Sequence, residues 1–162
     1  MIGIGIITCS DKGSKGERED VSGQTIKNIT EGVYKTIEYE IIPDDKDIIK
    51  STLLKFANNK EISLILTTGG TGFSHRDITP EATKEVIQRE ITGIPEAMRS
   101  FSLKYSKNAM LSRGIAGIIN DTIIVNLPGS PKAVRECLEY ILDPLNHGLG
   151  VLLGSIKECG HE

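Results

Sequence analysis

The amino-acid sequence predicts an α/β fold: a three-layer α/β/α arrangement with a mostly parallel sheet and one antiparallel hairpin, in a single domain spanning residues 1–162. Three observations predict this class. Short apolar runs alternate along the chain with segments in which apolar residues recur every three or four positions. Two apolar runs flank Asn120-Asp121, a pair typical of a hairpin turn. The length of 162 residues suits one domain with a proper core.

The first half of the chain is expected to contain three strands and two helices. The strands are expected at 3–9, 37–41 and 62–68, and the first is a continuous apolar run that suits a strand buried on both faces. One helix opens at Asp20, and the other buries a stripe formed by Ile48, Ile49, Leu53 and Phe56. The polar segment from Lys12 to Asp20 is expected to be a solvated loop that can close over a ligand.

Proline positions mark the helices of the second half. Thr79-Pro80-Glu81 predicts a helix with Thr79 as its N-cap, running from Pro80 to about Glu90, and Pro95 starts another. The hairpin is expected from strands at 115–119 and 122–127. Ser130-Pro131 repeats the cap and first-turn pattern, and it starts a C-terminal helix that Asp143-Pro144 interrupts or kinks.

Composition restricts the possible partners. The formal net charge of −3, the pI near 5.7 and the absence of Trp argue against nucleic acid as a partner. The first strand lacks the basic flank and cleavage site of a signal peptide and is too short to span a bilayer, so we expect a cytoplasmic protein without a membrane partner. Reduced thiols are expected at Cys9, Cys137 and Cys159, because they are far apart and lack CxxC spacing. No metal site is assigned to the scattered His75, His147 and His161.

Chemically useful residues follow four of the expected strands. The carboxyl ends of parallel strands share one edge of the sheet, and ligands of such sheets bind there. We therefore expect one ligand site built from Ser10-Asp11, Pro43-Asp44-Asp45, the glycine loop Thr68-Gly69-Gly70-Thr71-Gly72 with Asp77, and Pro128-Gly129-Ser130. Because glycine has no Cβ, the loop lets backbone N–H groups approach an anion closely, and it is a candidate phosphate cradle.

Asp44 and Asp77 are the candidate reactive carboxylates at this edge. They suit a general acid/base pair, as in glycoside hydrolysis. A phosphate cradle beside carboxylates fits nucleotide chemistry better, with an Asp holding Mg²⁺ that also binds phosphate oxygens. Structural roles stay open for both residues, with Asp44 as the cap of the next helix and Asp77 as a turn residue. Ser112-Arg113 supplies either a cation for a phosphate or a solvated arginine. The loop matches neither the Walker A motif nor the dinucleotide fingerprint.

Longer motifs extend over nearly the whole chain. The most specific is Thr67-Thr68-Gly69-Gly70-Thr71-Gly72 followed by Arg76-Asp77-Ile78-Thr79-Pro80-Glu81-Ala82. The others are Ser10-Asp11 with Asp20-x-x-Gly23, Pro43-Asp44, Gly93-x-Pro95-Glu96-Ala97-Met98-Arg99, Ser112-Arg113 and Asn126-Leu127-Pro128-Gly129-Ser130-Pro131. In these motifs the chain closely resembles the molybdenum cofactor biosynthesis family (the MogA/MoaB family) that includes molybdopterin adenylyltransferases and the G domains of gephyrin-type proteins.

This resemblance implies a Rossmann-like molybdopterin-binding domain and the adenylylation of molybdopterin. In that reaction ATP donates AMP to the terminal phosphate of the pterin, with Mg²⁺ as cofactor and release of pyrophosphate. The two catalytic aspartates of the family fall on Asp44 and Asp77, which are also the expected Mg²⁺ ligands. The residues expected to bind substrate and phosphate are Ser10, Asp11, Thr68, Gly69, Gly70, Thr71, Gly72, Ser112, Arg113, Pro128, Gly129 and Ser130.

The resemblance also implies partners. A homotrimer is expected, with a hexamer of paired trimers as the alternative, and a downstream molybdate-insertion enzyme is expected to receive the product. Two other functions remain open: a catalytically silent molybdopterin-binding paralogue, against which the retention of Asp44 and Asp77 argues, and a trimeric scaffold without turnover. A third alternative is the related molybdate-insertion family, which shares the fold and a glycine loop; its members are longer and multidomain, so a chain of 162 residues disfavours it. The motifs fit a molybdenum and a tungsten pathway equally.

Overall fold

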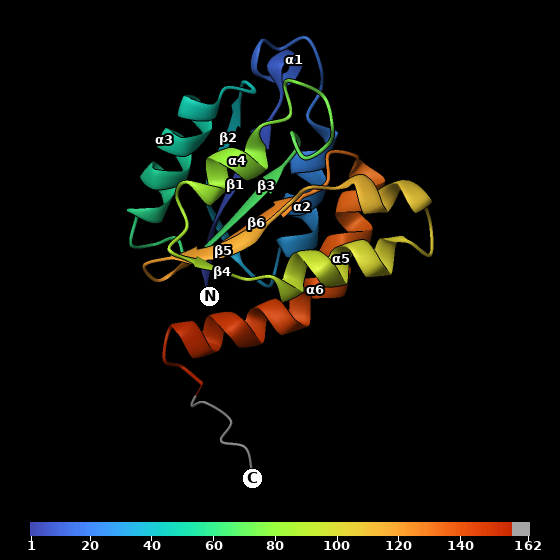
Figure 1. The fold of residues 1–162 in the computed structure, drawn as a ribbon. Coiled ribbons are helices and arrows are strands. Elements are labelled where there is room, and N and C mark those ends of the chain that lie inside the picture. Colours follow the sequence, from blue (N-terminus) through green and yellow to red (C-terminus); the bar gives the residue numbers. More distant parts are fainter. Residues whose placement is uncertain (157–162) are drawn as a thin grey trace.

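The computed structural model describes residues 1–156, so Cys159 and His161 lie outside the described residues. The described chain forms a six-stranded sheet in the order β2-β1-β3-β6-β5-β4 (Figure 1). Pairing is parallel from β2 through β1 and β3 to β6, and antiparallel from β6 through β5 to β4. The predicted fold class is therefore confirmed. The strands are β1 (Gly3–Cys9), β2 (Lys35–Ile42), β3 (Leu64–Thr68), β4 (Arg89–Glu90), β5 (Ala116–Ile119) and β6 (Thr122–Leu127).

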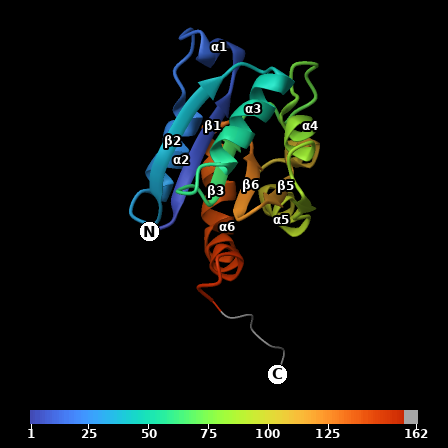
Figure 2. The same ribbon diagram turned by 90° about the vertical axis from the view of Figure 1, so that its left-hand side faces the viewer.

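Helices cover both faces of the sheet, which gives the predicted three layers (Figure 2). One face packs against α2 (Val21–Thr30), α5 (Gly93–Ser102) and α6 (Pro131–Leu152). The other face packs against α3 (Lys46–Ala57) and α4 (Thr79–Lys84). Two short helical segments complete the described elements: α1 (Asp11–Ser14) and the 3-10 helix η1 (Lys107–Leu111).

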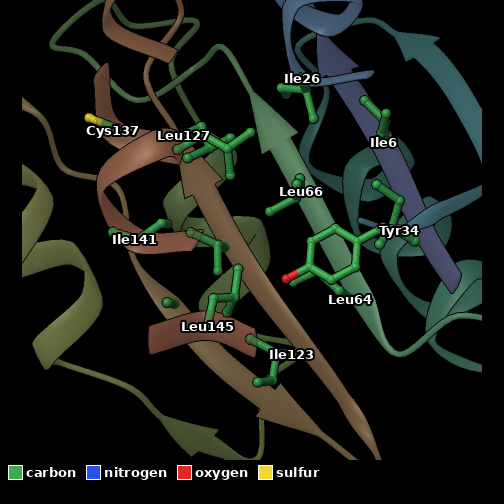
Figure 3. Close-up of a cluster of buried hydrophobic side chains, with 14 of the residues drawn as sticks. Ile6, Ile26, Tyr34, Leu64, Leu66, Ile123, Leu127, Cys137, Ile141 and Leu145 are labelled. Atoms are coloured by element: carbon green, nitrogen blue, oxygen red, sulfur yellow. The ribbon is translucent and has the colours of Figure 1, made fainter. Parts of the chain in front are cut away.

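The central strands are buried on both faces because each face has its own core. Every residue of β1 is buried, with Ile6 in the core under α2 and α6 and Ile7 in the core under α3. Phe56 of α3 lies so close to Gly5 that a Cβ there would collide with its ring. Figure 3 shows part of the first core, in which side chains of the sheet meet those of α6; the labelled residues include Ile6, Leu64, Leu66, Leu127, Ile141 and Leu145.

The helix predicted from Pro80 to about Glu90 is wrong in its extent and in its cap. It ends at Lys84, and the chain then forms the edge strand β4, flanked by hydrogen bonds from Gln88 N to Ile118 O and from Ile91 N to Ala116 O. Sheet pairing with β5 therefore competes successfully with continuation of the helix. Thr79 is not the N-cap: Ile78 holds that position without a side-chain cap.

Other local expectations were partly met. The polar segment after β1 contains α1, and Ile48 of the predicted α3 stripe is 40% exposed. Helix α6 runs through Pro144, although proline cannot donate to the carbonyl four residues earlier. Figure 1 shows its orange beginning and red end pointing in different directions. Over residues 1–156, no helix combines the length and the apolar character that a bilayer crossing requires.

Candidate active site

The carboxyl ends of β1, β2, β3 and β6 lie along one edge of the sheet, as the sequence predicted, because these four strands are parallel. A cavity of about 710 Å³ opens there. Helices α2 and α3 leave from this edge to opposite faces of the sheet, which opens a crevice between the loops. The cavity brings together these predicted site residues: Ser10, Asp44, Thr68, Gly69, Gly70, Asp77, Gly129 and Ser130.

The glycine loop has a backbone that only glycine adopts freely. Gly69 and Gly70 have φ values of 90° and 68°, and a Cβ would collide with the Cys9 carbonyl at Gly69 and with the Thr79 hydroxyl at Gly70. Thr79 Oγ1 donates to Gly69 O at 3.0 Å and Thr79 N donates to Gly70 O at 3.1 Å. Within residues 1–156, the N–H groups of Gly69, Gly70 and Thr71 donate no hydrogen bond to the protein. Thr79 therefore holds the glycine loop through its carbonyl groups, while the N–H groups of the loop stay available for an anion.

Asp44 does not cap helix α3, because the next residue, Asp45, holds that position. Asp45 Oδ1 accepts from Ile48 N at 3.0 Å and is the N-cap of α3. Asp44 Oδ2 accepts from Asp11 N at 3.0 Å, whereas Asp44 Oδ1 is buried without a hydrogen-bond partner among the described residues. Burial raises the pKa of Asp44, and the nearby Asp11 and Asp77 charges act in the same direction. Helix capping, one of the two roles left open for Asp44, therefore belongs to Asp45.

Asp77 is the turn residue that the sequence allowed, and it also lines the cavity. It forms a local turn, since Asp77 Oδ2 accepts from Ser74 N at 2.9 Å and Asp77 N donates to Ser74 O at 2.9 Å. It also lines the cavity that Asp44 lines.

The cavity has an excess of negative charge. Glu19, Asp20, Asp44 and Asp77 line it, together with the guanidinium of Arg18. The unpartnered Asp44 Oδ1 and the carboxylate of Asp77 are hard oxygen donors that suit Mg²⁺. This cation typically takes one or two protein carboxylates and completes its shell with phosphates and water. In the described part of the chain, no three His, Cys, Asp or Glu side chains gather as a preformed metal site.

Two helix N-termini border the cavity and favour anions. Ser130 Oγ caps α6 by accepting from Ala133 N at 3.2 Å, as predicted, and Asp20 Oδ1 caps α2 by accepting from Gly23 N at 2.8 Å. Ser22 Oγ donates to Gly129 O at 2.6 Å and so joins the start of α2 to the loop before α6.

Asp20 is held by more than its capping bond. Its Oδ2 accepts hydrogen bonds from Thr8 and from Tyr39, whose pKa is raised by burial and by the Asp20 carboxylate. This network fixes the wall of the cavity between β1, β2 and α2.

A second cavity of about 360 Å³ adjoins the first and shares Ser130 with it. Its lining includes Met98 and Arg99 of α5 and Lys132 of α6. The predicted residues Thr71, Gly72, Ser112 and Pro128 line this cavity and not the first. The glycine loop therefore separates two neighbouring cavities.

Arg113 and Asp11 line neither cavity. Arg113 lies against the far side of the glycine loop, where its Nε donates to Gly72 O at 2.7 Å, its Nη2 donates to Asp77 O at 2.8 Å and its Nη1 pairs with Glu81. The Asp11 carboxylate accepts from Asp44 N at 3.0 Å and from the Arg76 guanidinium. Arg113 therefore contacts the loop that carries Asp77, and Asp11 contacts both Asp44 and the residue before Asp77.

Several cavity residues were not among the predicted site residues. Arg18 and Glu19 lie in the polar segment that was expected to close over a ligand, which is the signal that could have identified them. Gly13 and Asp20 lie in the same segment, and Asp20 also belongs to the motif Asp20-x-x-Gly23. The residues without such a signal are Thr8, Cys9, Val21, Ser22 and Pro131.

The sequence and the fold resemble those of known proteins. Residues 5–147 match the protein family described as "Probable molybdopterin binding domain". The chain is 45% identical over 164 residues to the molybdopterin adenylyltransferase of Helicobacter pylori strain J99, with coverage of 99% of this chain and 93% of that protein. The structure of the molybdopterin biosynthesis enzyme MoaB of Thermus thermophilus matches with a TM-score of 0.89 and 45% identity, covering 95% of this chain and 98% of that one. The tungsten cofactor synthesizing protein MoaB of Pyrococcus furiosus matches with a TM-score of 0.84 and 37% identity, covering 92% and 95%.

Proposed function

The chain belongs to the family of molybdopterin-binding domains in molybdenum cofactor biosynthesis, and from that membership we propose that it is a molybdopterin adenylyltransferase. An oxygen of the terminal phosphate of molybdopterin attacks the α-phosphorus of ATP. A new phosphoanhydride bond forms, the bond between the α-phosphorus and the bridging oxygen breaks, and pyrophosphate leaves with that electron pair. The products are adenylylated molybdopterin and pyrophosphate.

One observation carries the proposal: two carboxylates, a glycine loop with unused N–H groups and the N-termini of α2 and α6 meet at one cavity. The loop and the helix ends suit the phosphates of a nucleotide. The adjoining cavity behind the loop supplies room for a second substrate. A reaction between two phosphate-bearing molecules needs both kinds of space.

The residues at the cavity act by positioning and by electrostatics. The attacking phosphate oxygen is anionic at neutral pH, so it needs no strong general base. The barrier is lowered when the two phosphates are held in line and their charge is compensated. We assign this work to the N–H groups of Gly69 to Thr71 and to the cap of α6 at Ser130.

We assign the binding of Mg²⁺ to Asp44 and Asp77. Both are carboxylates at the same cavity, and Asp44 Oδ1 has no other partner among the described residues. When bound, Mg²⁺ would supply charge neutralisation for the polyphosphate. The acidic lining supports this assignment, since an ATP polyphosphate beside these carboxylates would otherwise be repelled.

Pyrophosphate release from ATP, measured with and without molybdopterin at fixed Mg²⁺, tests this function. Wild type is expected to release pyrophosphate only when molybdopterin is present, and Asp44→Ala and Asp77→Asn are expected to lose most of this release. Asp121→Asn is the matched control, because Asp121 is an exposed carboxylate in the turn between β5 and β6.

Two results would contradict parts of the proposal. No release by wild type, together with measurable molybdopterin binding, would favour a silent paralogue or a scaffold. Wild-type turnover with normal Mg²⁺ dependence in Asp77→Asn would contradict the role given to Asp77.

We propose further that the protein acts in the cytoplasm as a homotrimer and delivers its product to a molybdate-insertion enzyme. Light scattering distinguishes a trimer from a hexamer. The similarity to a tungsten cofactor synthesizing protein leaves two metals to compare, and metal analysis of the final cofactor distinguishes molybdenum from tungsten.

A further inference from the structure

Asp11 and Asp44 are joined by two reciprocal hydrogen bonds. Asp11 N donates to Asp44 Oδ2 at 3.0 Å, and Asp44 N donates to Asp11 Oδ1 at 3.0 Å. Each carboxylate thus fixes the backbone that carries the other. The two residues are 33 positions apart, at the ends of β1 and β2, so the pair also fixes the spacing of two loops at the site.

Arg76 holds the outer side of this pair. Its Nε donates to Asp11 Oδ2 and its Nη2 donates to Asp11 Oδ1, both at 2.9 Å. A planar guanidinium that binds both oxygens of a carboxylate fixes the plane of that carboxylate, which a lysine cannot do. Arg76 lies one residue before Asp77, so the contact also joins the loop of Asp77 to that of Asp44.

The chain of contacts begins outside the cavity and ends inside it. Asp44 and Asp77 line the cavity, whereas Arg76 and Asp11 do not. The Arg76 side chain is 63% exposed, so it faces solvent on the outer side of the loops. An arginine that served as a direct phosphate ligand would be expected in the cavity wall, as Arg18 is.

We propose that Arg76 and Asp11 are positioning residues for this reaction, which orient the Asp44 carboxylate and set its distance from Asp77 without contacting substrate. The proposal rests on the adenylyltransferase function proposed above. The Asp11 backbone N–H holds Asp44 Oδ2, and Asp11 Oδ1 holds the Asp44 backbone N–H, so both the Asp44 carboxylate and the backbone that carries it are fixed. Asp44 Oδ1 stays without a partner among the described residues and is left for the site. Loss of Arg76 frees the Asp11 carboxylate to rotate, which loosens its hydrogen bond to the Asp44 backbone N–H and so the backbone that carries the Asp44 carboxylate.

The kinetic test compares wild type with Arg76→Ala, Arg76→Lys and Asp11→Asn in the pyrophosphate assay at saturating molybdopterin. A misplaced catalytic group lowers turnover more than substrate binding. In Arg76→Ala we expect kcat to fall by about 10-fold or more and KM for ATP to stay within about twofold. Arg76→Lys is expected to keep only part of the wild-type kcat, because lysine keeps the positive charge but cannot bind both oxygens of the Asp11 carboxylate in one plane. The double variant Arg76→Ala/Asp11→Asn is expected to have a kcat no lower than that of the worse single variant, because both residues act through Asp44.

The matched control is Arg135→Ala. Arg135 forms a similar exposed ion pair with Glu139 at 3.1 Å on α6, lies outside both cavities and is expected to leave kcat and KM unchanged. Circular dichroism and melting temperature show whether each variant folds, and the exposed Arg76 variants serve as the test if Asp11→Asn does not fold.

A second measurement is independent of turnover. Amide ¹H–¹⁵N spectra report the N–H groups of Asp11 and Asp44, and Arg76→Ala is expected to shift both signals and to speed their hydrogen exchange, while Arg135→Ala leaves them unchanged. If wild type shows no turnover but these signals respond, the proposed function has failed and the contact chain stands. Unchanged amide signals, wild-type kcat in Arg76→Ala, or a raised KM for ATP at unchanged kcat would overturn the positioning role.

Discussion

Asn126 of β6 donates from Nδ2 to Oγ1 of Thr83 on α4 at 3.0 Å, and both side chains are buried. Nδ2 also donates to Thr67 Oγ1 at 3.0 Å, and Oδ1 accepts from Ile115 N at 3.2 Å. This amide joins two strands and a helix directly beneath the glycine loop. Replacing it with Leu leaves buried donors and acceptors without partners, so Asn126→Leu is expected to lower the free energy of unfolding by about 2–4 kcal/mol in urea denaturation.

A double-mutant cycle with Thr83→Val checks the origin of that loss. Because the two side chains share one hydrogen bond, the double variant is expected to lose less than the sum of the two single losses. Additive losses would contradict the coupling between Asn126 and Thr83.

Gly70→Ala is expected to damage the protein more than Gly32→Ala does. Both glycines have positive φ, 68° and 83°, so both alanines carry a backbone cost of about 1–2 kcal/mol. Only at Gly70 would the new Cβ collide with Thr79, whose hydrogen bonds hold the loop, since nothing lies within 4 Å at Gly32. Unfolding and pyrophosphate assays are expected to show an extra loss of stability and a loss of turnover in Gly70→Ala alone. Equal stability and equal turnover of Gly70→Ala and Gly32→Ala would show that the loop accommodates a Cβ beside Thr79.

Cys9 is expected to resist thiol reagents in the native protein. It is 4% exposed, and burial raises its pKa to about 12, so the reactive thiolate is scarce at neutral pH. Peptide mapping after brief treatment with iodoacetamide is expected to find Cys9 unmodified without urea and modified in urea. Rapid native modification would mean that β1 opens at the site edge.

The ion pairs of Glu85 are expected to contribute to stability in a pH-dependent way. Lys46 and Lys50 lower the pKa of Glu85 to about 2. A carboxyl whose pKa is depressed by folding stabilises the protein above its ordinary pKa, and this contribution is lost as pH falls toward the depressed value. Glu85→Gln is therefore expected to melt slightly below wild type at pH 7, with the difference shrinking from pH 5 to pH 3 and in 1 M salt. A difference that does not depend on pH would point to packing.

The strands and the shared edge could be predicted from the sequence because buried parallel strands are short apolar runs and because turn residues follow them directly. The extent of α4 could not. Glu81 to Glu90 has a helical pattern, and only the tertiary partners Ile118 and Ala116 favour the strand pairing that replaces it. The role of Thr79 was missed for a similar reason, since its position before Pro80 is typical of a cap but its hydroxyl donates to Gly69 O.

At the site, residue type predicted which groups gather but not which of them face the cavity. Asp44 and Asp77 line it, as expected from their place after the strands. Asp11 and Arg113 have the same polar character, yet neither lines it. The direction of a side chain at a loop depends on partners distant in sequence, such as Arg76 for Asp11, 65 positions away.

The same long separations govern when the site can exist during synthesis of the chain. Ser22 bonds Gly129 across 107 positions, and Thr68 bonds Pro128 across 60. While β6 is still inside the ribosome, the growing chain can form β1, β2 and β3 but lacks the side of the cavity that Gly129 and Ser130 supply. Closing loops of this length is slow compared with forming helices. On the proposed function, nucleotide is therefore expected to bind only after the last strand has docked, and to stabilise the finished fold in preference to every earlier intermediate.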